Sequence, residues 1–316
     1  MRFFIKSVFW ICLALVFLAV VSCGKKKEGT QYQGGTQYMV VDLDTGEARF
    51  TNDAPDLSDD TCRTKELWLR WIPAGTFTMG SPRDELGRFD NEVLHKVTLT
   101  RGYWMGIFEV TQKQWIMLMG ANPSEFKGDT RAVMNVSYDD ICGKEKGANW
   151  PTGEHEVDEG SFLWELRSRT GLAFDLPTEA QWEYACRAGT TTALNSGKNL
   201  TDERKCPNMA EVGRYEGNLS DGKGGYDGLA KVGSYKPNAW GLYDMHGNVW
   251  EWCLDYYGSY PTLVVTDPQG PDSGSYRVMR GGAWYNFARN CRSAYRVYDT
   301  PSYRDSFYGF RVVFCP

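Results

Sequence analysis

The sequence predicts an α+β fold with few helices, short antiparallel strands and much irregular loop. Helix-start signals are few, and the alternating apolar runs that are typical of strands are short, as at 97–99 and 310–313. Between 190 and 308 there is hardly any periodicity, and Gly, Asn, Asp and Trp dominate. A core in that region must therefore rest on loops that side-chain contacts, metals or disulfides hold in place.

The predicted helices begin at capping boxes, in which a Thr side chain and a Gln three residues later satisfy each other's free backbone donors. Thr111 with Gln114 marks one helix, and Thr178 with Gln181 marks a second. We expect a third helix over 161–170, because apolar residues recur there on one face before a glycine.

The chain begins with a pattern typical of a secretory leader. Arg2 and Lys6 precede an apolar run over 8–21, which is shorter than the roughly 20 residues that a spanning helix needs. The sequence Val-Val-Ser-Cys that ends at Cys23 resembles a bacterial lipobox. We therefore expect a signal peptide at 1–22, a lipid on Cys23, and attachment to a membrane of the bacterial cell envelope, facing the periplasm or the exterior. An uncleaved anchor helix or an ordinary leader with an incidental cysteine is the alternative.

The net charge limits the classes of partner, and the cysteine count limits the disulfides that can form. Loss of residues 1–22 removes two positive charges, so the formal charge of −5 becomes −7. An acidic protein of this kind argues against nucleic acid as a partner and suits a hard cation such as calcium. Of nine cysteines, seven follow Cys23; because seven is odd, at least one is unpaired, and disulfides among the others are expected without a fixed connectivity.

The chain divides into four segments. After the leader at 1–22, residues 23–38 form a lipidated and flexible tether in which Gly-Thr-Gln-Tyr occurs twice. Residues 39–64 are expected to hold short strands and a connector. The main domain then runs over 65–316.

Seven motifs in the main domain, in this order, resemble the formylglycine-generating enzyme family, which also bears the name sulfatase-modifying factor. They are Trp71–Ser81 (WIPAGTFTMGS), Glu92–Leu99 (EVLHKVTL), Glu109–Gln114 (EVTQKQ), Leu176–Ala185 (LPTEAQWEYA), Asn238–Trp252 (NAWGLYDMHGNVWEW), Arg280–Gly282 (RGG) and Gly309–Arg311 (GFR). The resemblance implies a C-type-lectin-like α+β fold. It also implies oxidation of a sulfatase cysteine to formylglycine by oxygen and a copper(I) ion held by two cysteines.

The copper pair is where this sequence departs from the family. Counting from the paired glycines places Asn286 at the first copper cysteine and Cys291 at the second, and Ala283 replaces a serine. Counting back from 299–301 shifts Cys291 off its place. Because one thiolate cannot form the two-coordinate copper(I) site, we expect a binding protein without copper-dependent oxidase activity. An active formylglycine-generating enzyme or a related oxidoreductase that acts on sulfatase-type peptides is the alternative.

In the binding protein, the family cleft is expected to contact a peptide or small ligand, and a sulfatase is a possible partner. The contact residues predicted from the resemblance are Arg280, Trp284, Asn286 and Arg292. The aromatic set Trp240, Tyr243, Trp250, Trp252, Trp284 and Tyr285 either lines that cleft or belongs to the core.

The resemblance also implies calcium sites. Asp244 and Glu251 match side-chain ligands, and Gly247 and Val249 match carbonyl ligands. A second, weaker site is expected to use Asn208, Met209 and Tyr226, although Gly224 stands where the family has an aspartate. Alternatively, the carboxylates only accept hydrogen bonds from loop amides.

The remaining sulfur and nitrogen groups are assigned structural roles. Cys186 and Cys291 are candidates for a disulfide that fastens the irregular C-terminal half to a helix; two buried free thiols are the alternative. No two of His95, His155 and His246 share a local ligand spacing. We therefore expect hydrogen-bonded or solvated histidines rather than an iron site.

Overall fold

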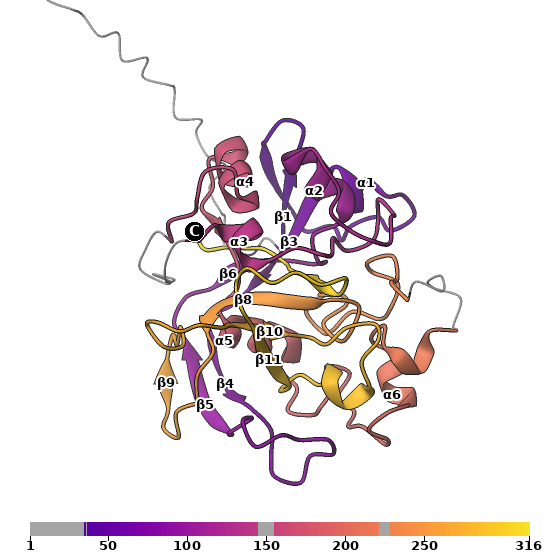
Figure 1. The fold of residues 1–316 in the computed structure, drawn as a ribbon, viewed down its shortest axis with the longest axis vertical. Helices are drawn as coiled ribbons and strands as arrows, with labels where there is room; N and C mark the ends of the chain where they lie inside the picture. Colours follow the sequence, from indigo (N-terminus) through magenta and orange to yellow (C-terminus); the bar gives the residue numbers. More distant parts are fainter. Residues whose placement is uncertain (1–34, 36, 145–154, 221–227) are drawn as a thin grey trace, which may run out of the picture. The chain divides into compact units, whose positions relative to one another are not determined.

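The computed structural model describes residues 35, 37–144, 155–220 and 228–316 (Figure 1). The leader, Cys23 and Tyr226 lie outside these ranges. The described residues belong to one compact unit. Among the described residues, no helix is long and apolar enough to cross a membrane.

The largest sheet contains the N-terminal strands. Its order is β2-β1-β3-β6-β13-β7, and all of its pairs are antiparallel. The strands are β1 (Tyr38–Asp42), β2 (Ala48–Thr51), β3 (Glu66–Ile72), β6 (Tyr103–Gly106), β7 (Phe174–Asp175) and β13 (Val313–Phe314). The whole of β1 pairs with β3, from Tyr38 opposite Arg70 to Asp42 opposite Glu66. The boundary expected at residue 65 therefore divides paired strands, and residues 39–64 belong to the main domain.

Two smaller sheets are built from the rest of the chain. The four-stranded sheet has the order β11-β10-β8-β12, and the three-stranded sheet has the order β4-β5-β9. The strands are β4 (Gly75–Met79), β5 (His95–Leu99), β8 (Trp250–Tyr256), β9 (Val265–Thr266), β10 (Arg277–Arg280), β11 (Arg296–Asp299) and β12 (Tyr308–Gly309). Only β12 with β8 and β9 with β5 pair in parallel among these strands.

The described helices are short. They are α1 (Thr61–Thr64), α2 (Gln112–Met119), α3 (Tyr138–Cys142), α4 (Phe162–Thr170), α5 (Glu179–Arg187), α6 (Pro207–Ala210) and the 3-10 turns η1 (Glu216–Asn218) and η2 (Ala288–Cys291). Both predicted capping boxes are present, at Thr111 and at Thr178. The helix expected over 161–170 is confirmed as α4, with Ser161 as its N-cap. A third capping box, at Ser137, starts α3 and was not predicted.

Large aromatic side chains fill the core between these elements. Trp104, Trp182 and Trp252 are fully buried. The ring of Trp115 on α2 stacks on Phe162 of α4, with ring centroids 5.2 Å apart. Helix α5 packs against β8 and β10, as Figure 1 shows, so its buried acidic side chains face the strand that ends at the predicted family site. The short-element α+β fold expected from the sequence is confirmed.

Candidate functional site

The predicted family site begins where β10 ends in two glycines. Gly281 and Gly282 have φ angles of 95° and 79°, which a residue with a side chain adopts only under strain. A Cβ atom on Gly282 would lie 2.5 Å from the sulfur of Cys291. The paired glycines therefore let the turn after β10 pack directly on this cysteine.

Asn286 closes the turn that follows. Its Oδ1 accepts a hydrogen bond from the backbone N–H of Ala283 at 2.9 Å, and its own N–H donates to the Ala283 carbonyl at 2.9 Å. The amide thus has a structural role at the position where the resemblance places the first copper cysteine.

Cys291, at the end of η2, is fully buried. It packs with Ala193, Leu194 and Tyr215 in a small apolar cluster. Burial raises the pKa of its thiol far above the ordinary value. At neutral pH the group is therefore a protonated thiol without access to solvent, which is the opposite of a reactive thiolate.

Arg280 and Arg292 were predicted to contact a ligand, and the structure corrects this. Both guanidinium groups are fully buried. Arg280 pairs with Glu179 and Glu183, while Arg292 pairs with Glu85 and Glu92, at 2.6 Å in each case. These arginines hold loops to α5 and to the segment after β4, so neither can reach a ligand.

Tyr285, in contrast, is exposed on the same turn, whereas Trp284 beside it is partly buried against the core. Tyr285 is 40% exposed and Trp284 is half-buried. Their rings, 5.7 Å apart, continue to Phe307 at 4.4 Å from Tyr285 and to Phe126 at 6.0 Å from Trp284. We call these four residues the aromatic surface. Of the wider aromatic set, Trp250 and Trp252 are core residues, and Trp240 and Tyr243 are partly buried against the core.

The predicted disulfide between Cys186 and Cys291 is not formed. Both side chains are free, buried thiols. His246 lies between them: its Nε2 is 3.9 Å from the Cys186 sulfur, and its Nδ1 is 2.6 Å from the Cys291 carbonyl oxygen. Nε2 also accepts the N–H of Asn195 at 3.0 Å. Burial lowers the pKa of His246 to about 4. A neutral, hydrogen-bonded imidazole therefore contacts the Cys186 sulfur and the Cys291 backbone.

The loop predicted to hold calcium is contacted by a guanidinium group of the protein, that of Arg311. Arg311 contacts both oxygens of Glu251 at 2.6 Å, and Trp182 donates to the same carboxylate. Asp244 accepts the N–H of Gly233 at 2.6 Å through Oδ2, whereas its Oδ1 is buried without a hydrogen-bond partner. In this arrangement Glu251 does not fit the ligand role, and only Asp244 keeps an oxygen for a cation. Calcium at these residues and at the carbonyls of Gly247 and Val249 stays a prediction.

The second predicted calcium site falls partly outside the described residues. Asn208 lies on α6, and its amide donates to the carbonyl of Asn199 at 2.8 Å. Met209 beside it is buried. Because Tyr226 is not described, these residues are not brought together here.

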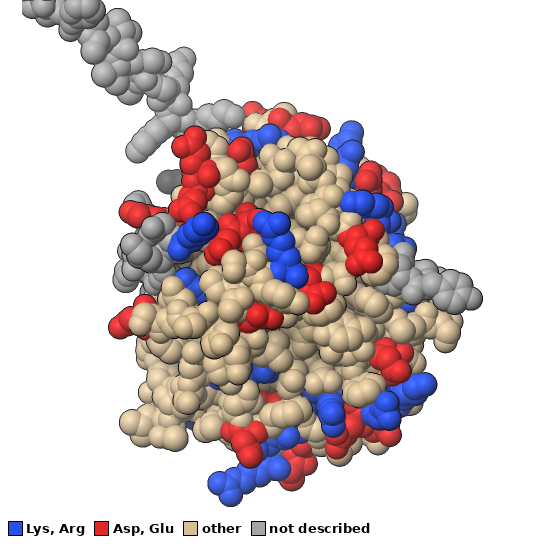
Figure 2. All heavy atoms as spheres, viewed as in Figure 1, with Lys and Arg blue, Asp and Glu red and all other residues tan. Residues whose placement is uncertain are grey.

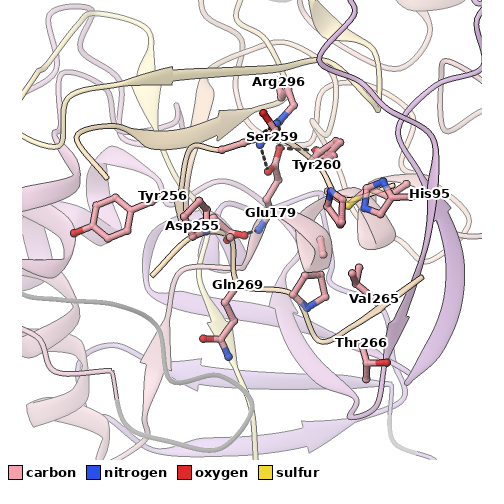
Figure 3. A pocket seen from close by; sticks show the side chains of 17 residues that line it. His95, Glu179, Asp255, Tyr256, Ser259, Tyr260, Val265, Thr266, Gln269 and Arg296 are labelled. Atoms are coloured by element: carbon pink, nitrogen blue, oxygen red, sulfur yellow. Dashed lines mark hydrogen bonds and ion pairs between the residues drawn. The ribbon is translucent and has the colours of Figure 1, made fainter. Parts of the chain in front are cut away.

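A pocket of about 510 Å³ is lined by Glu179 and Ala180 at the start of α5 and by the segment after β8 (Figure 3). In it, Arg296 holds Glu179 with two contacts of 2.6 and 2.7 Å, and the Tyr260 hydroxyl donates to the same carboxylate at 2.7 Å. Asp255 accepts the N–H of Glu179 at 2.7 Å. Burial, with Glu179 nearby, raises the pKa of Asp255 to about 7. His95 lines the opposite wall, hydrogen-bonded to the Val93 carbonyl.

Sequence reasoning missed this pocket. Its walls include Pro261, Pro268 and Pro271 from the aperiodic stretch, where no motif signals a site.

Figure 2 shows Lys and Arg intermixed with Asp and Glu, and a broad area with few charges in the middle of the face that it displays.

Comparison with known proteins gives matching results from sequence and from structure. The model of the sulfatase-modifying factor enzyme 1-like domain matches residues 56–315. The formylglycine-generating enzyme of Mus musculus is 30% identical over 273 residues, which cover 76% of this chain and 73% of the enzyme. Treponema denticola variable protein 1 has a TM-score of 0.62 and 30% identity, covering 79% of this chain and 96% of that one. PvdO from Pseudomonas aeruginosa has a TM-score of 0.63 and 26% identity, covering 79% and 95%.

The domain match spans most of the chain, and it includes all seven motifs, the paired glycines and the loop around Asp244. The structural neighbours share the α+β arrangement of short strands and few helices. The chain therefore belongs to the sulfatase-modifying factor family, in which formylglycine-generating enzymes are found.

Proposed function

We propose that this chain is a ligand-binding protein on the family fold, without copper-dependent oxidase activity. The proposal rests on the two residues at the positions of the family's copper cysteines. Asn286 closes a turn, and Cys291 is a fully buried thiol beneath it. Copper(I) needs two soft thiolates that it can reach. A single buried thiol does not provide that site.

The aromatic surface is the proposed contact region for a peptide. Its rings are large, amphipathic and fixed by few rotatable bonds, so they supply contact area at a low cost in conformational entropy. Trp284 is held by its backbone N–H, which donates to the Asn248 carbonyl at 3.0 Å. Tyr303, 48% exposed, extends the region through Tyr308. A rigid turn that presents the exposed ring of Tyr285 suits recognition rather than oxidation.

The position of the protein in the cell follows from its N-terminus, and it is part of the proposal. Cleavage before Cys23 and acylation of its sulfur attach the domain to a membrane of the bacterial envelope. We expect the wild-type chain to incorporate radiolabelled palmitate in a bacterial host and the Cys23→Ser variant to lose the label. Equal label in both chains contradicts the lipid anchor.

Oxidase activity is the second candidate, since the mouse formylglycine-generating enzyme is 30% identical over most of the chain. The test incubates the full chain with copper(I), oxygen and a Cys-x-Pro-x-Arg peptide, followed by mass spectrometry of the peptide. We expect the cysteine to remain unchanged. Conversion of its side chain to an aldehyde, abolished by Cys291→Ser, overturns the proposal.

Binding is tested by selecting a displayed library of random peptides against the full chain in detergent. Selected peptides are expected to bind about tenfold more weakly to Tyr285→Ala, because a central aromatic contact is lost. Tyr276→Ala is the matched control, since Tyr276 is 43% exposed and lies outside the aromatic surface. Equal losses in the two variants contradict this choice of surface.

A further inference from the structure

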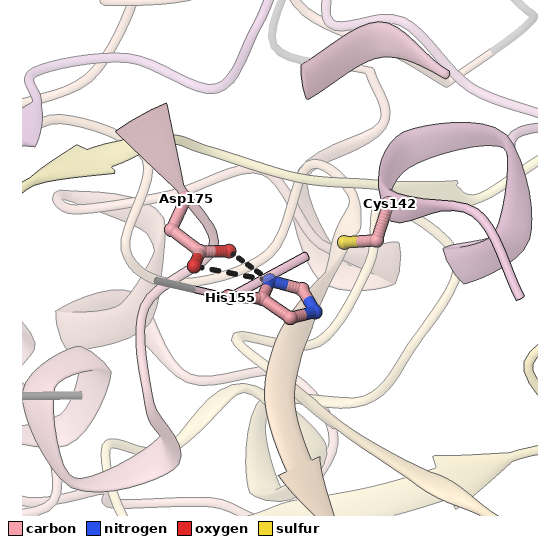
Figure 4. Close-up of side chains that lie close together, drawn as sticks. All are labelled: Cys142, His155 and Asp175. Atoms are coloured by element: carbon pink, nitrogen blue, oxygen red, sulfur yellow. Dashed lines mark hydrogen bonds and ion pairs between the residues drawn. The ribbon is translucent and has the colours of Figure 1, made fainter. Parts of the chain in front are cut away.

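Cys142, His155 and Asp175 meet at the base of the segment between α3 and α4 (Figure 4). Cys142 ends α3, and Asp175 ends the edge strand β7. One ligand atom from each side chain lies within 4.8 Å of the others, and no other such trio of His, Cys, Asp or Glu occurs in the described part of the chain. The three residues are 13 and 20 positions apart in sequence, and neither the aromatic surface nor the pocket uses them.

Two of the three side chains are buried, and the Asp175 side chain is 17% exposed. Cys142 is 0% exposed and His155 is 2% exposed. Nδ1 of His155 lies 2.9 and 3.0 Å from the two oxygens of Asp175, whereas Nε2 is buried without a hydrogen-bond partner. Figure 4 shows the Cys142 sulfur directed toward the imidazole ring.

Further hydrogen bonds and an ion pair already hold the three residues in place. Arg167 donates to the His155 carbonyl at 2.6 Å and lies 3.4 Å from Oδ2 of Asp175. The Asp158 N–H donates to the Cys142 carbonyl at 3.0 Å, and the Lys144 N–H donates to the Asp158 carboxylate at 2.7 Å. These contacts fix the backbone on both sides of the trio, as the outer contacts of a metal site do.

We propose that Cys142, Nδ1 of His155 and Asp175 bind a zinc ion, which takes the place of the proton between Nδ1 and the carboxylate as that proton moves to Nε2. Zinc takes mixed sulfur, nitrogen and oxygen ligands at about 2.0–2.3 Å in tetrahedral geometry, so its donor atoms lie roughly 3.3–3.8 Å apart. The trio needs only a small contraction to reach that spacing. A thiolate and a carboxylate offset the two charges of the ion, which lets the site stay buried. Binding releases the thiol proton to solvent.

Such an ion joins three separate parts of the fold. It ties the end of α3 and the segment at His155 to the edge of the six-stranded sheet at β7. Because zinc binds the folded arrangement and not the dispersed ligands of the unfolded chain, it stabilises this corner of the domain.

The experiment uses the full chain in detergent, with Zn²⁺ alone and Co²⁺ alone as probes. After removal of loose metal, the wild type is expected to retain about one equivalent of zinc. With Co²⁺ it is expected to show near-ultraviolet thiolate-to-cobalt charge-transfer absorption. Cys142→Ser is expected to lose that absorption and to bind zinc at least tenfold more weakly. Cys253→Ser, which alters another buried free thiol, is the matched control and is expected to behave as the wild type.

A wild-type spectrum without thiolate absorption overturns the proposal by itself, whatever the variants do. Absorption that persists in Cys142→Ser overturns it as well. His155→Gln keeps a side-chain donor for Asp175 and serves if the serine variant fails to fold; unchanged zinc affinity in this variant also counts against the site.

Discussion

Two buried clusters of charge, one around Arg311 and one around Arg280, differ in the balance between acids and guanidinium groups. Arg311 is the counter-charge for Glu251 and also acts on Glu109 and Asp244. Burial raises the pKa of Asp244 to about 6 and that of Glu109 well above its ordinary value. The cluster around Arg311 therefore carries more acid than it can neutralise.

Around Arg280, the acids are matched. Glu179 is shared by Arg280 and Arg296, and Glu183 is shared by Arg280 and Arg187. Burial acts to raise the pKa of Glu179, but Arg296 and Arg280 together lower it. Equal burial thus has opposite results in the two clusters, and the number of guanidinium groups decides which result appears. An added cation is therefore expected to stabilise the fold most at the cluster with the surplus of acid.

The largest effect is expected from Arg311→Met. It leaves three buried acids without their guanidinium group, at a cost of about 3–5 kcal/mol in the free energy of unfolding, measured by denaturant titration. Millimolar calcium added to this variant tests the predicted ligands Asp244, Gly247, Val249 and Glu251. Recovery of stability with calcium assigns the ion to this loop, whereas no change removes it from these residues.

Asp255→Asn sharpens the comparison, because Asp255 lies beside the matched cluster without a guanidinium contact of its own. Its folded pKa of about 7 exceeds the ordinary value of 3.8, so stability is lost as pH rises from about 4 through 7. The asparagine can still accept the Glu179 N–H and avoids that loss. We expect free energies of unfolding that agree near pH 4 and favour the variant by about 2–4 kcal/mol above pH 7, measured by denaturant titration at each pH. A difference independent of pH contradicts this origin.

Arg280→Met is expected to cost less than Arg311→Met, about 2–3 kcal/mol, because Glu179 keeps Arg296 and Glu183 keeps Arg187. The measurement is the same denaturant titration, with Arg289→Met as control. Arg289 is 39% exposed in its pair with Glu203, so its loss is expected to cost well under 1 kcal/mol. A larger loss for Arg280→Met than for Arg311→Met contradicts the idea that the balance of charges decides.

The parts of the fold that the sequence predicts are those with local causes. The capping boxes at Thr111 and Thr178 depend on residues three positions apart, and both helices begin there. The family motifs likewise predicted the α+β architecture. The pairing of β1 with β3 was missed, because strand pairing depends on contacts that no short window of sequence contains.

The site residues also divide into those whose role a local stretch of sequence indicates and those whose role depends on distant contacts. That an asparagine, Asn286, stands five residues before Cys291 could be read from the sequence directly, whereas the role of Arg292 could not. Its partners Glu85 and Glu92 lie about 200 residues earlier in the chain, so an arginine that directly follows Cys291 looked available for a ligand. The trio of Cys142, His155 and Asp175 has no local spacing that would signal it.

The smallest effect compares the two capping boxes, each of which lies next to one of the charge clusters. Thr178→Ala removes a side-chain acceptor from the Gln181 N–H and is expected to cost about 1 kcal/mol. Thr111→Ala is expected to cost about 2 kcal/mol, because the Thr111 hydroxyl also donates to the buried Arg63 carbonyl at 2.6 Å. Paired unfolding titrations check the order. If Thr178→Ala costs more, the cap of α5 also positions Glu179 between its two arginines, and the matched cluster depends on the helix start as well as on its charges.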